Sequence, residues 1–237
     1  MTKISARNSA GYDAPIGLAA DPVVLTVHER QLAVLLVRRR EPPAKGRWSL
    51  PGGFVGATED PADTVKRKLE EKTGIPPIYL EQLRTYAEPG RDPRGWLPSI
   101  AYLALVPWEL LAPEPSGDAA WHGVRRLPRL AFDHARMIGD ALERVRGKLW
   151  YSNIAVGLLP PEFTLAQARE VYEVLAGLEY DPGNFSRDLR ASGLVVETGR
   201  LAERPRAGRP GRLYRFASSD PTWTPRYAKA TAPTATG

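Results

Sequence analysis

Short apolar runs separated by polar turns dominate the first half of the chain. Such runs are typical of β-strands. They are found at residues 23–27 (VVLTV), 32–39 (LAVLLVRR), 47–55 (RWSLPGGFV), 80–87 (LEQLRTYA) and 99–106 (SIAYLALV). The polar residues HERQ between the first two runs are typical of a hairpin turn. Pro51, Gly52 and Gly53 break the third run into a loop.

Two other segments of this region have the three- and four-residue spacing of apolar positions that is typical of amphipathic helices. The first covers residues 59–74 (EDPADTVKRKLEEKTG). Asp60 is a suitable cap for this helix, Pro61 fits its first position and Gly74 ends it. The second covers residues 132–149 (FDHARMIGDALERVRGKL), with Asp133 as its expected cap. Its apolar stripe consists of Met137, Ile138, Ala141, Leu142 and Val145. Strands mixed with two helices predict an α+β domain.

The pattern changes after Pro160 and Pro161, which favour a domain boundary there. Thr164 can cap a helix over residues 165–177, and residues 184–193 (NFSRDLRASG) predict a second helix. A strand (LVVET), an arginine-rich loop and a second strand (RLYRFA) follow. This order predicts a winged helix-turn-helix, although a small helical interaction domain with a charged hairpin has the same order.

We therefore expect five segments along the chain. They are a flexible N-terminal segment (1–20), an α+β domain with a mixed sheet and flanking helices (21–150), a linker (151–162), a winged helix-turn-helix (163–220) and a disordered tail (221–237). The 237 residues, of which 43% are hydrophobic, provide enough chain for two cores of ordinary size.

Composition excludes several classes of chemistry. The sequence has no cysteine, so disulfides, thiolate catalysis and cysteine-bound zinc are excluded. Its three histidines are scattered, and any metal would need oxygen ligands. We see no apolar run of the roughly 20 residues that span a membrane and no apolar core of a signal peptide. We expect a cytoplasmic, nucleoid-associated protein with no membrane partner.

The positive charge is concentrated near the C-terminus. Residues 199–230 contain eight basic and two acidic side chains, which accounts for the whole net charge of +6. This distribution favours a polyanionic partner, the alternative being a solvated basic tail. Four basic residues fall in the arginine-rich loop and at the start of the following strand: Arg204, Arg206, Arg209 and Arg212. Such a wing suits phosphate contacts or insertion into the minor groove.

The second helix of this region has the chemistry of a DNA-recognition helix. Phe185 and Leu189 lie one turn apart and are expected to be buried. The opposite face carries small or polar residues that can reach base edges: Asn184, Ser186, Arg187 and Arg190. Their donors and acceptors suit the major groove of double-stranded DNA.

The first helix of the α+β domain carries a motif that resembles the Nudix box, G-x5-E-x7-R-E-U-x-E-E-x-G-U. The matching residues are Gly53, Glu59, Arg67, Leu69, Glu71, Gly74 and Ile75. Lys68 and Lys72 stand where the family has glutamates. An unrelated capped amphipathic helix is the alternative.

The two lysines change the chemistry that the motif implies. Positions 68, 71 and 72 share a helix face, where the resemblance implies glutamates that hold Mg²⁺ against a diphosphate. Lys68, Glu71 and Lys72 together carry a charge of +1, which disfavours a hard dication. A lysine here can instead pair with phosphate oxygens. Glu71 alone still permits a weakly held ion and residual hydrolysis.

Nearly the whole chain resembles the Nudix-related transcriptional regulators of NAD metabolism, the NrtR family. Besides the box, the resemblance rests on EPGRDPRG (88–95), AFDHARMIGDALERVRGKL (131–149) and AGRPGRLYRF (207–216). It implies a homodimeric repressor of NAD biosynthesis or salvage genes that binds a palindromic operator and senses ADP-ribose or a related nucleotide. It implies no catalytic residue and no required cofactor or metal.

Within this resemblance we expect the effector to contact one set of residues in the Nudix-like domain. The set is Arg38, Arg39, Trp48, Gly52, Gly53, Lys68, Glu71, Lys72, Arg91 and Arg94. His134 is expected to be structural. The rival hypothesis is an active, metal-dependent ADP-ribose pyrophosphatase with an accessory DNA-binding or interaction domain, since Glu59, Arg67 and Glu71 are retained.

Overall fold

The chain folds as two compact units. The computed structural model describes residues 6–7, 13–74, 77–111, 117–149, 152–203 and 210–220. The first unit takes the described residues of Met1–Leu25, Ala33–Leu105 and Leu111–Leu142. The second takes those of Thr26–Leu32, Val106–Leu110 and Glu143–Gly237. Strand β3 (Ala19–His28) therefore runs from the first unit into the second, and strand β4 (Gln31–Arg38) runs from the second back into the first.

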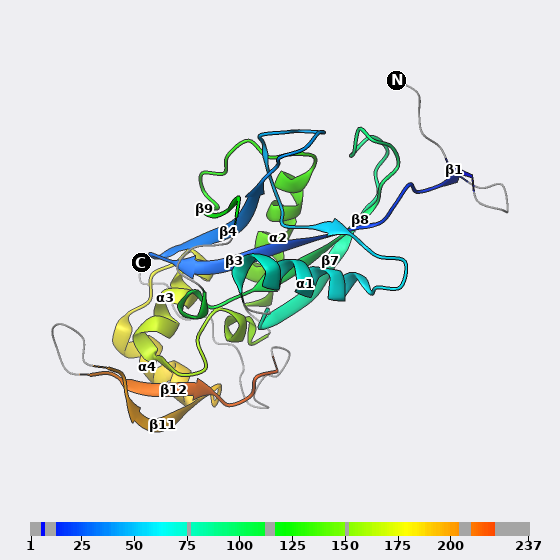
Figure 1. Cartoon of the computed structure of the whole chain (residues 1–237). Coiled ribbons are helices and arrows are strands. Elements are labelled where there is room, and N and C mark those ends of the chain that lie inside the picture. The colour runs from blue at the N-terminus through cyan, green and yellow to red at the C-terminus, as the bar shows by residue number, and fades with distance from the viewer. Residues whose placement is uncertain are drawn as a thin grey trace. The chain divides into compact units, whose positions relative to one another are not determined.

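A mixed sheet forms the centre of the first unit (Figure 1). Its strands are β3 (Ala19–His28), β4 (Gln31–Arg38), β5 (Trp48–Ser49), β6 (Gly53–Phe54), β7 (Tyr79–Tyr86), β8 (Ser99–Leu105) and β9 (Ala119–Gly123). The order is β5-β4-β3-β8-β7, with β6 paired to β3 and β9 to β4. Strands β3 and β8 are parallel, whereas β7 is antiparallel to β8. Strands β1 (Ala6–Arg7) and β2 (Asp13–Ala14) form a separate pair.

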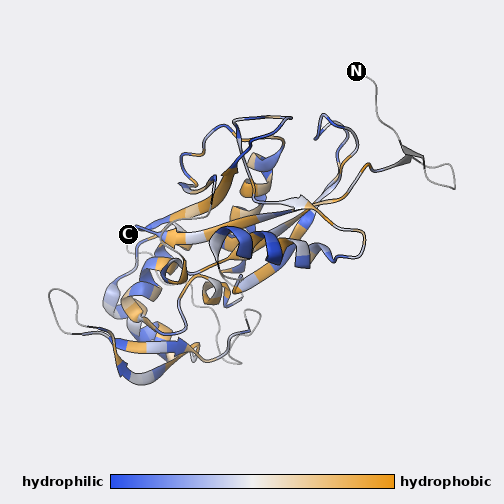
Figure 2. Ribbon diagram, in the orientation of Figure 1, coloured by the Kyte–Doolittle hydropathy of each residue, from blue (hydrophilic) through white to orange (hydrophobic). Residues whose placement is uncertain are grey.

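Helices α1 (Pro61–Thr73) and α2 (His134–Lys148) cover opposite faces of this sheet (Figure 1). On one face, the fully buried Val65 of α1 packs with Ala20 and Tyr102. On the other, the hydroxyl of Tyr86 donates to Asp140 of α2 at 2.6 Å. Figure 2 shows that the strands between the helices are largely hydrophobic, as a sheet buried on both faces requires.

The start and end of α1 follow the local signals in the sequence. The carboxylate of Asp60 accepts a hydrogen bond from the Ala62 amide at 2.8 Å, Pro61 occupies the first turn, and Gly74 ends the helix with a left-handed φ of 77°. These features confirm the predicted cap, first position and stop. The side chain of Asp133, the expected cap of α2, is bound elsewhere. Asp133 precedes the helix, but its carboxylate accepts both of its hydrogen bonds from Arg91.

The second unit has the order of a winged helix. Its elements are η1 (Trp108–Leu110), η2 (Ile154–Gly157), β10 (Phe163–Thr164), α3 (Leu165–Ala176), α4 (Pro182–Ala191), β11 (Val195–Leu201) and β12 (Arg212–Phe216). The strands form an antiparallel sheet in the order β10-β12-β11. Thr164 and Gln167 form a reciprocal capping box at the start of α3, which confirms the predicted cap.

Several elements depart from the sequence-based prediction. Helix α4 begins at Pro182, two residues before the expected start, because Asp181 caps it through the Asn184 amide at 2.8 Å. Strand β9 was not predicted, since Ala, His and Gly do not favour strands, and it forms by pairing with β4. Strand β10, which is two residues long, was also not predicted, and it forms by pairing with β12. In the described part of the chain, no helix has the length and apolarity that crossing a membrane requires.

Candidate ligand site and nucleic-acid interface

Two cations of the Nudix-like helix α1, Arg67 and Lys68, pair with Glu71 of the same helix and with Glu59, which precedes it. Arg67 donates from Nε and Nη2 to Glu59 at 3.0 and 2.9 Å, and from Nη1 to Glu71 at 3.4 Å. Lys68 donates to Glu71 at 3.0 Å. The hydrogen bond from Arg67 lowers the pKa of Glu59 to about 2, and the one from Lys68 lowers the pKa of Glu71. Both side chains are therefore carboxylates that already have cationic partners.

This arrangement does not fit the divalent metal that the Nudix motif implies. Lys68 lies against Gly53 of β6, where an added Cβ would come within 3.2 Å of the lysine Cε. Lys72 contributes positive charge near Asp118. Among the residues that the structure describes, no group of three His, Cys, Asp or Glu side chains is placed to hold a metal ion. The face presents ammonium groups where a dication needs oxygen ligands.

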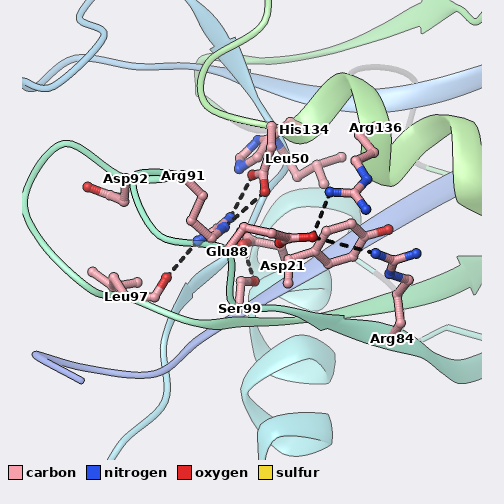
Figure 3. A network of polar contacts seen from close by, with 12 residues as sticks. Asp21, Leu50, Arg84, Glu88, Arg91, Asp92, Leu97, Ser99, His134 and Arg136 are labelled. Carbon is pink, nitrogen blue, oxygen red and sulfur yellow. Dashed lines mark hydrogen bonds and ion pairs between the residues drawn. The ribbon is translucent and has the colours of Figure 1, made fainter. Parts of the chain in front are cut away.

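The loop between β5 and β6 needs glycine at position 52. β5 pairs with the end of β4, and β6 pairs with the start of β3, so this loop lies where those strand ends meet. A Cβ at Gly52 would lie 1.9 Å from the Asp21 carboxylate and 2.6 Å from the Ala20 carbonyl oxygen. The buried Asp21 also accepts a hydrogen bond from Ser99 at 2.6 Å (Figure 3). Backbone and carboxylate thus approach each other as closely as glycine allows.

Two arginines and two aromatic rings form a cationic cluster beside β6. The guanidinium carbons of Arg39 and Arg94 lie 4.8 and 5.8 Å from the ring centre of Phe132, and that of Arg94 lies 5.3 Å from Phe54. The Phe54 ring is exposed. The buried Asp92 holds Arg94 through hydrogen bonds of 3.0 and 2.7 Å. Burial and the nearby Arg94 lower the pKa of Arg39. Such a pair of cations favours an anionic ligand.

Arg91 and His134 hold the scaffold together instead (Figure 3). The side chain of Arg91 is 5% exposed and donates to both oxygens of Asp133 and, at 2.8 Å, to the carbonyl oxygen of Leu97. His134 is buried, and its Nδ1 accepts from the Leu50 amide at 2.9 Å. Burial lowers the pKa of His134. These contacts favour structural roles for both residues.

Arg38 and Trp48 lie opposite each other in the β4–β5 pair. Arg38 is exposed, and Trp48 is half-buried with its ring edge-on to His122 at 4.4 Å. The chain also brings together residues that the sequence prediction omitted, namely Asp21, Phe54, Asp92 and Phe132. Phe54 had a signal in the sequence, since it follows the Gly52-Gly53 pair. Phe132 had none, because its position depends on contacts across the fold.

Helix α4 presents the polar face expected of a recognition helix. Phe185 and Leu189 are buried, as predicted. Of the predicted DNA-binding residues, Asn184, Arg187 and Arg190 are exposed and Ser186 is half-buried. Among the described residues, the contacts of Arg187 and Arg190 are local, with Asp188 and the Ser186 carbonyl oxygen, both at 3.0 Å. Their side chains are therefore held by partners that a phosphate or base can replace.

The wing is the hairpin of β11 and β12. Arg212 forms an ion pair with Glu197, and Arg200 forms one with Glu162 at 2.9 Å. Both arginine side chains are well exposed. Arg204, Arg206 and Arg209, predicted at the wing tip, lie outside the described residues, as does Ile75 of the Nudix-like motif.

Comparison with known proteins identifies the family. Residues 18–140 match the NUDIX domain, and residues 155–216 match the NrtR DNA-binding winged helix domain. The chain belongs to the NrtR family. One NrtR-family relative, from Acinetobacter baylyi, is named an ADPR responsive transcriptional repressor and is 35% identical over 215 residues, 88% of this chain and 85% of the relative.

Solved structures of an NrtR protein support the same assignment. Shewanella oneidensis NrtR complexed with a 27mer DNA is 37% identical, with a TM-score of 0.78 over 86% of this chain and 95% of that chain. The NUDIX domain of the same protein complexed with ADP ribose is 38% identical, with a TM-score of 0.51 over 58% of this chain and 93% of that one. The predicted resemblance and the predicted fold, a Nudix-like α+β domain followed by a winged helix, are confirmed.

A third relative is an enzyme. The ADP-ribose pyrophosphatase of Methanocaldococcus jannaschii is 38% identical over 120 residues, which are 50% of this chain and 71% of the enzyme. The matched length equals about half of this chain, whereas the regulator from Acinetobacter matches most of it.

Proposed function

We propose that this protein is a DNA-binding transcriptional repressor whose Nudix domain senses ADP-ribose and does not hydrolyse it at a significant rate. The observation that carries this proposal is a Nudix helix with lysines at positions 68 and 72 in a chain that also has an NrtR winged helix. The regulated genes belong to NAD biosynthesis or salvage, and the protein acts in the cytoplasm.

The cationic cluster supports an anionic ligand with an aromatic ring. Arg39 and Arg94 are two fixed cations that suit a diphosphate, and the exposed ring of Phe54 offers a surface on which a base can stack. Lys68 of α1 adds a third cation, since its side chain lies against Gly53, the neighbour of Phe54 in β6. ADP-ribose contains both chemical groups, a diphosphate and an adenine base.

The polar face of α4 supports sequence-specific binding in the major groove. Asn184 and Arg187 are exposed and of the types that read base edges, whereas Arg190 and Arg212 suit phosphates. Ser186 and the wing arginines, Arg204, Arg206 and Arg209, complete the proposed DNA-binding set. The proposal includes a homodimer on a palindromic operator, since dimeric helix-turn-helix proteins bind two half-sites related by the symmetry of the protein.

The rival function is ADP-ribose pyrophosphatase activity with an accessory DNA-binding domain. It is favoured by the retained Glu59, Arg67 and Glu71 and by the enzyme from Methanocaldococcus jannaschii that matches this domain. Against it, Glu59 and Glu71 are both paired with cations of α1. An enzyme of this class needs carboxylates that are available to a metal.

One pair of measurements separates the two functions. The full-length protein is used to select fragments of its own genome, and anisotropy then gives the affinity for the winning palindrome with and without ADP-ribose. In parallel, protein incubated with ADP-ribose and Mg²⁺ or Mn²⁺ is assayed for AMP by chromatography. The proposed function requires selective DNA binding that ADP-ribose changes, with little AMP released. Rapid, metal-dependent AMP release without selective DNA binding establishes the enzyme instead.

A further inference from the structure

The unit that carries the winged helix also contains the turn between β3 and β4. Glu29 and Arg30 form this turn with φ values of 47° and 56°. Two-residue hairpin turns of this kind usually have Asn, Asp or Gly at these positions, because other side chains are strained there. Two long charged residues break this local rule, which points to a function for one of the side chains.

Arg30 binds helix α3 through both its backbone and its side chain. Its amide donates to Glu170 at 3.1 Å, and its Nη2 donates to Oε2 of Glu173 at 2.9 Å. The other oxygen of Glu173 accepts from Arg169 at 2.6 Å and from the Tyr180 amide at 3.1 Å. The side chain of Glu173 is only 4% exposed, so its charge depends on these donors.

The pKa of Glu173 reflects this balance. Burial acts to raise it, but the hydrogen bonds from the Tyr180 amide, Arg30 and Arg169 outweigh burial, and the pKa lies below its ordinary value. Glu173 is therefore an ionised, buried carboxylate with one donor from the β3–β4 turn and two from the winged helix. A change in the position of Arg30 alters the electrostatic environment of this carboxylate directly.

The contacts of Glu173 continue to the recognition helix. Tyr180, whose amide binds Glu173, stacks its ring on Phe185 of α4 with the ring centres 5.6 Å apart. The ring of Tyr172 meets Phe185 from another side at 5.5 Å. Phe185 is the buried residue between the exposed Asn184 and Arg187 of α4. A displacement at Glu173 thus reaches the residues proposed to read DNA.

The same turn joins the two strands that carry parts of the ligand site. β3 begins beside Gly52 with Ala20 and Asp21, and β4 leads into Arg39. A second contact holds the end of β3 in the winged-helix unit, where the ring of His28 stacks on Trp108 with centres 3.7 Å apart. The strands are therefore covalent links between the ligand site at one end and an anchored turn at the other.

We propose that Arg30, through its ion pair with the buried Glu173, couples the ligand site to the recognition helix. This inference rests on the proposed function, since it describes how ADP-ribose changes DNA binding. A ligand shifts a two-state equilibrium only by its difference in affinity for the two states. The states must then differ at the Arg30–Glu173 contact, and removing that contact must reduce the coupling between the two ligands.

The test is Arg30→Gly in the full-length protein. Glycine adopts a φ of 56° without strain, so the turn and its backbone hydrogen bond to Glu170 are kept while the ion pair is lost. Glu29→Gly is the matched control, because it makes the same change in the same turn at a side chain that is 75% exposed. The quantity measured is the ratio of operator dissociation constants with and without saturating ADP-ribose.

We expect Arg30→Gly to bring this ratio at least fivefold closer to one, and Glu29→Gly to keep it within twofold of the wild-type value. A wild-type ratio of one overturns the proposed function, and this inference with it. A wild-type ratio different from one that is unchanged in Arg30→Gly overturns only the inference. Hydrogen exchange of the Tyr180 amide is a second readout, independent of DNA. ADP-ribose should change its protection in the wild type, and the inference fails if it does not.

Discussion

Replacing the two lysines of α1 by glutamate should raise the affinity of the Nudix-like site for a divalent metal ion. The changes Lys68→Glu and Lys72→Glu convert the sum of charges at positions 68, 71 and 72 from +1 to −3. They also release Glu71 from its 3.0 Å hydrogen bond with Lys68. Three carboxylates on one helix face provide the oxygen ligands that Mg²⁺ and Mn²⁺ prefer.

The size of the effect follows from the geometry of Lys68. A unit charge about 4 Å from a dication contributes roughly 8 kcal/mol at an effective dielectric constant of 20. The side chain of Lys68 is 30% exposed, so solvent screens most of this energy. The interaction free energy of a partly exposed pair of unit charges is roughly 0.2–1 kcal/mol. The second charge of a dication doubles this energy. Replacing a repulsive lysine by an attractive glutamate doubles the difference again. About 1–4 kcal/mol per position corresponds to at least a roughly fivefold gain for each lysine.

Mn²⁺ binding, followed by electron paramagnetic resonance, measures this gain. The double variant should bind Mn²⁺ at least about fivefold more tightly than the wild type, because positions 68 and 72 face the same ion and the effects of neighbouring sites are not additive. Lys66→Glu is the matched control, since Lys66 lies on the same helix but pairs with Asp63 at 2.9 Å, away from Glu71. Equal Mn²⁺ affinities in the wild type, the control and the double variant would refute the argument that these lysines exclude the metal.

Three further predictions concern the first unit. Gly52→Ala should lower the free energy of unfolding by about 1–3 kcal/mol in urea titrations. The reason is that its Cβ would lie 2.6 Å from a backbone oxygen of β3. Glycine-to-alanine changes within α2, where the new Cβ has no atom within 4 Å, should not lower the free energy of unfolding in this way. The pKa of Glu59 is lowered to about 2 by its pair with Arg67. This pair therefore stabilises the fold fully at pH values above the ordinary carboxylate pKa, and the stabilisation is lost as the pH falls toward 2. An NMR titration should find that midpoint, and Arg67→Ala should raise it; a wild-type midpoint near 4 contradicts the pairing. Arg94→Ala should weaken ADP-ribose binding about tenfold or more in calorimetry, while Arg91→Ala should mainly lower Tm, and an unchanged Tm for Arg91→Ala would count against its structural role.

Elements with local signals could be predicted from the sequence. The Asp60-Pro61 pair and Gly74 fixed both ends of α1 because caps and stops depend on neighbouring residues alone. The same signal is present at Asp181-Pro182, but the prediction started the second helix at residue 184. The structure shows that Asp181 caps α4 in the same way as Asp60 caps α1. Both helices begin at an Asp-Pro pair, so the same local rule predicts both starts.

Contacts between distant segments could not be predicted in this way. Arg91 and Arg94 lie three residues apart in the same loop, and the sequence treats them as equivalent. In the structure Arg94 pairs with Asp92 within the loop, whereas Arg91 pairs with Asp133, which is 42 residues away. Strand β9 likewise depends on its pairing with β4. The sequence therefore predicts which residue types gather near the ligand site, but tertiary contacts decide which of them remain available.

The lysines of α1 fit the needs of a sensor better than those of an enzyme. A bound signal must persist long enough to change DNA binding, and an enzyme that cleaves its ligand limits that time. A cation such as Lys68 can offset the charge of a diphosphate, as a metal does, but it cannot lower the pKa of a bound water. Glu59 and Glu71, paired with Arg67 and Lys68, are then available to hold these cations in place. In the proposed function, the retained helix keeps affinity for the ligand, and the lysines at positions 68 and 72 remove the reaction.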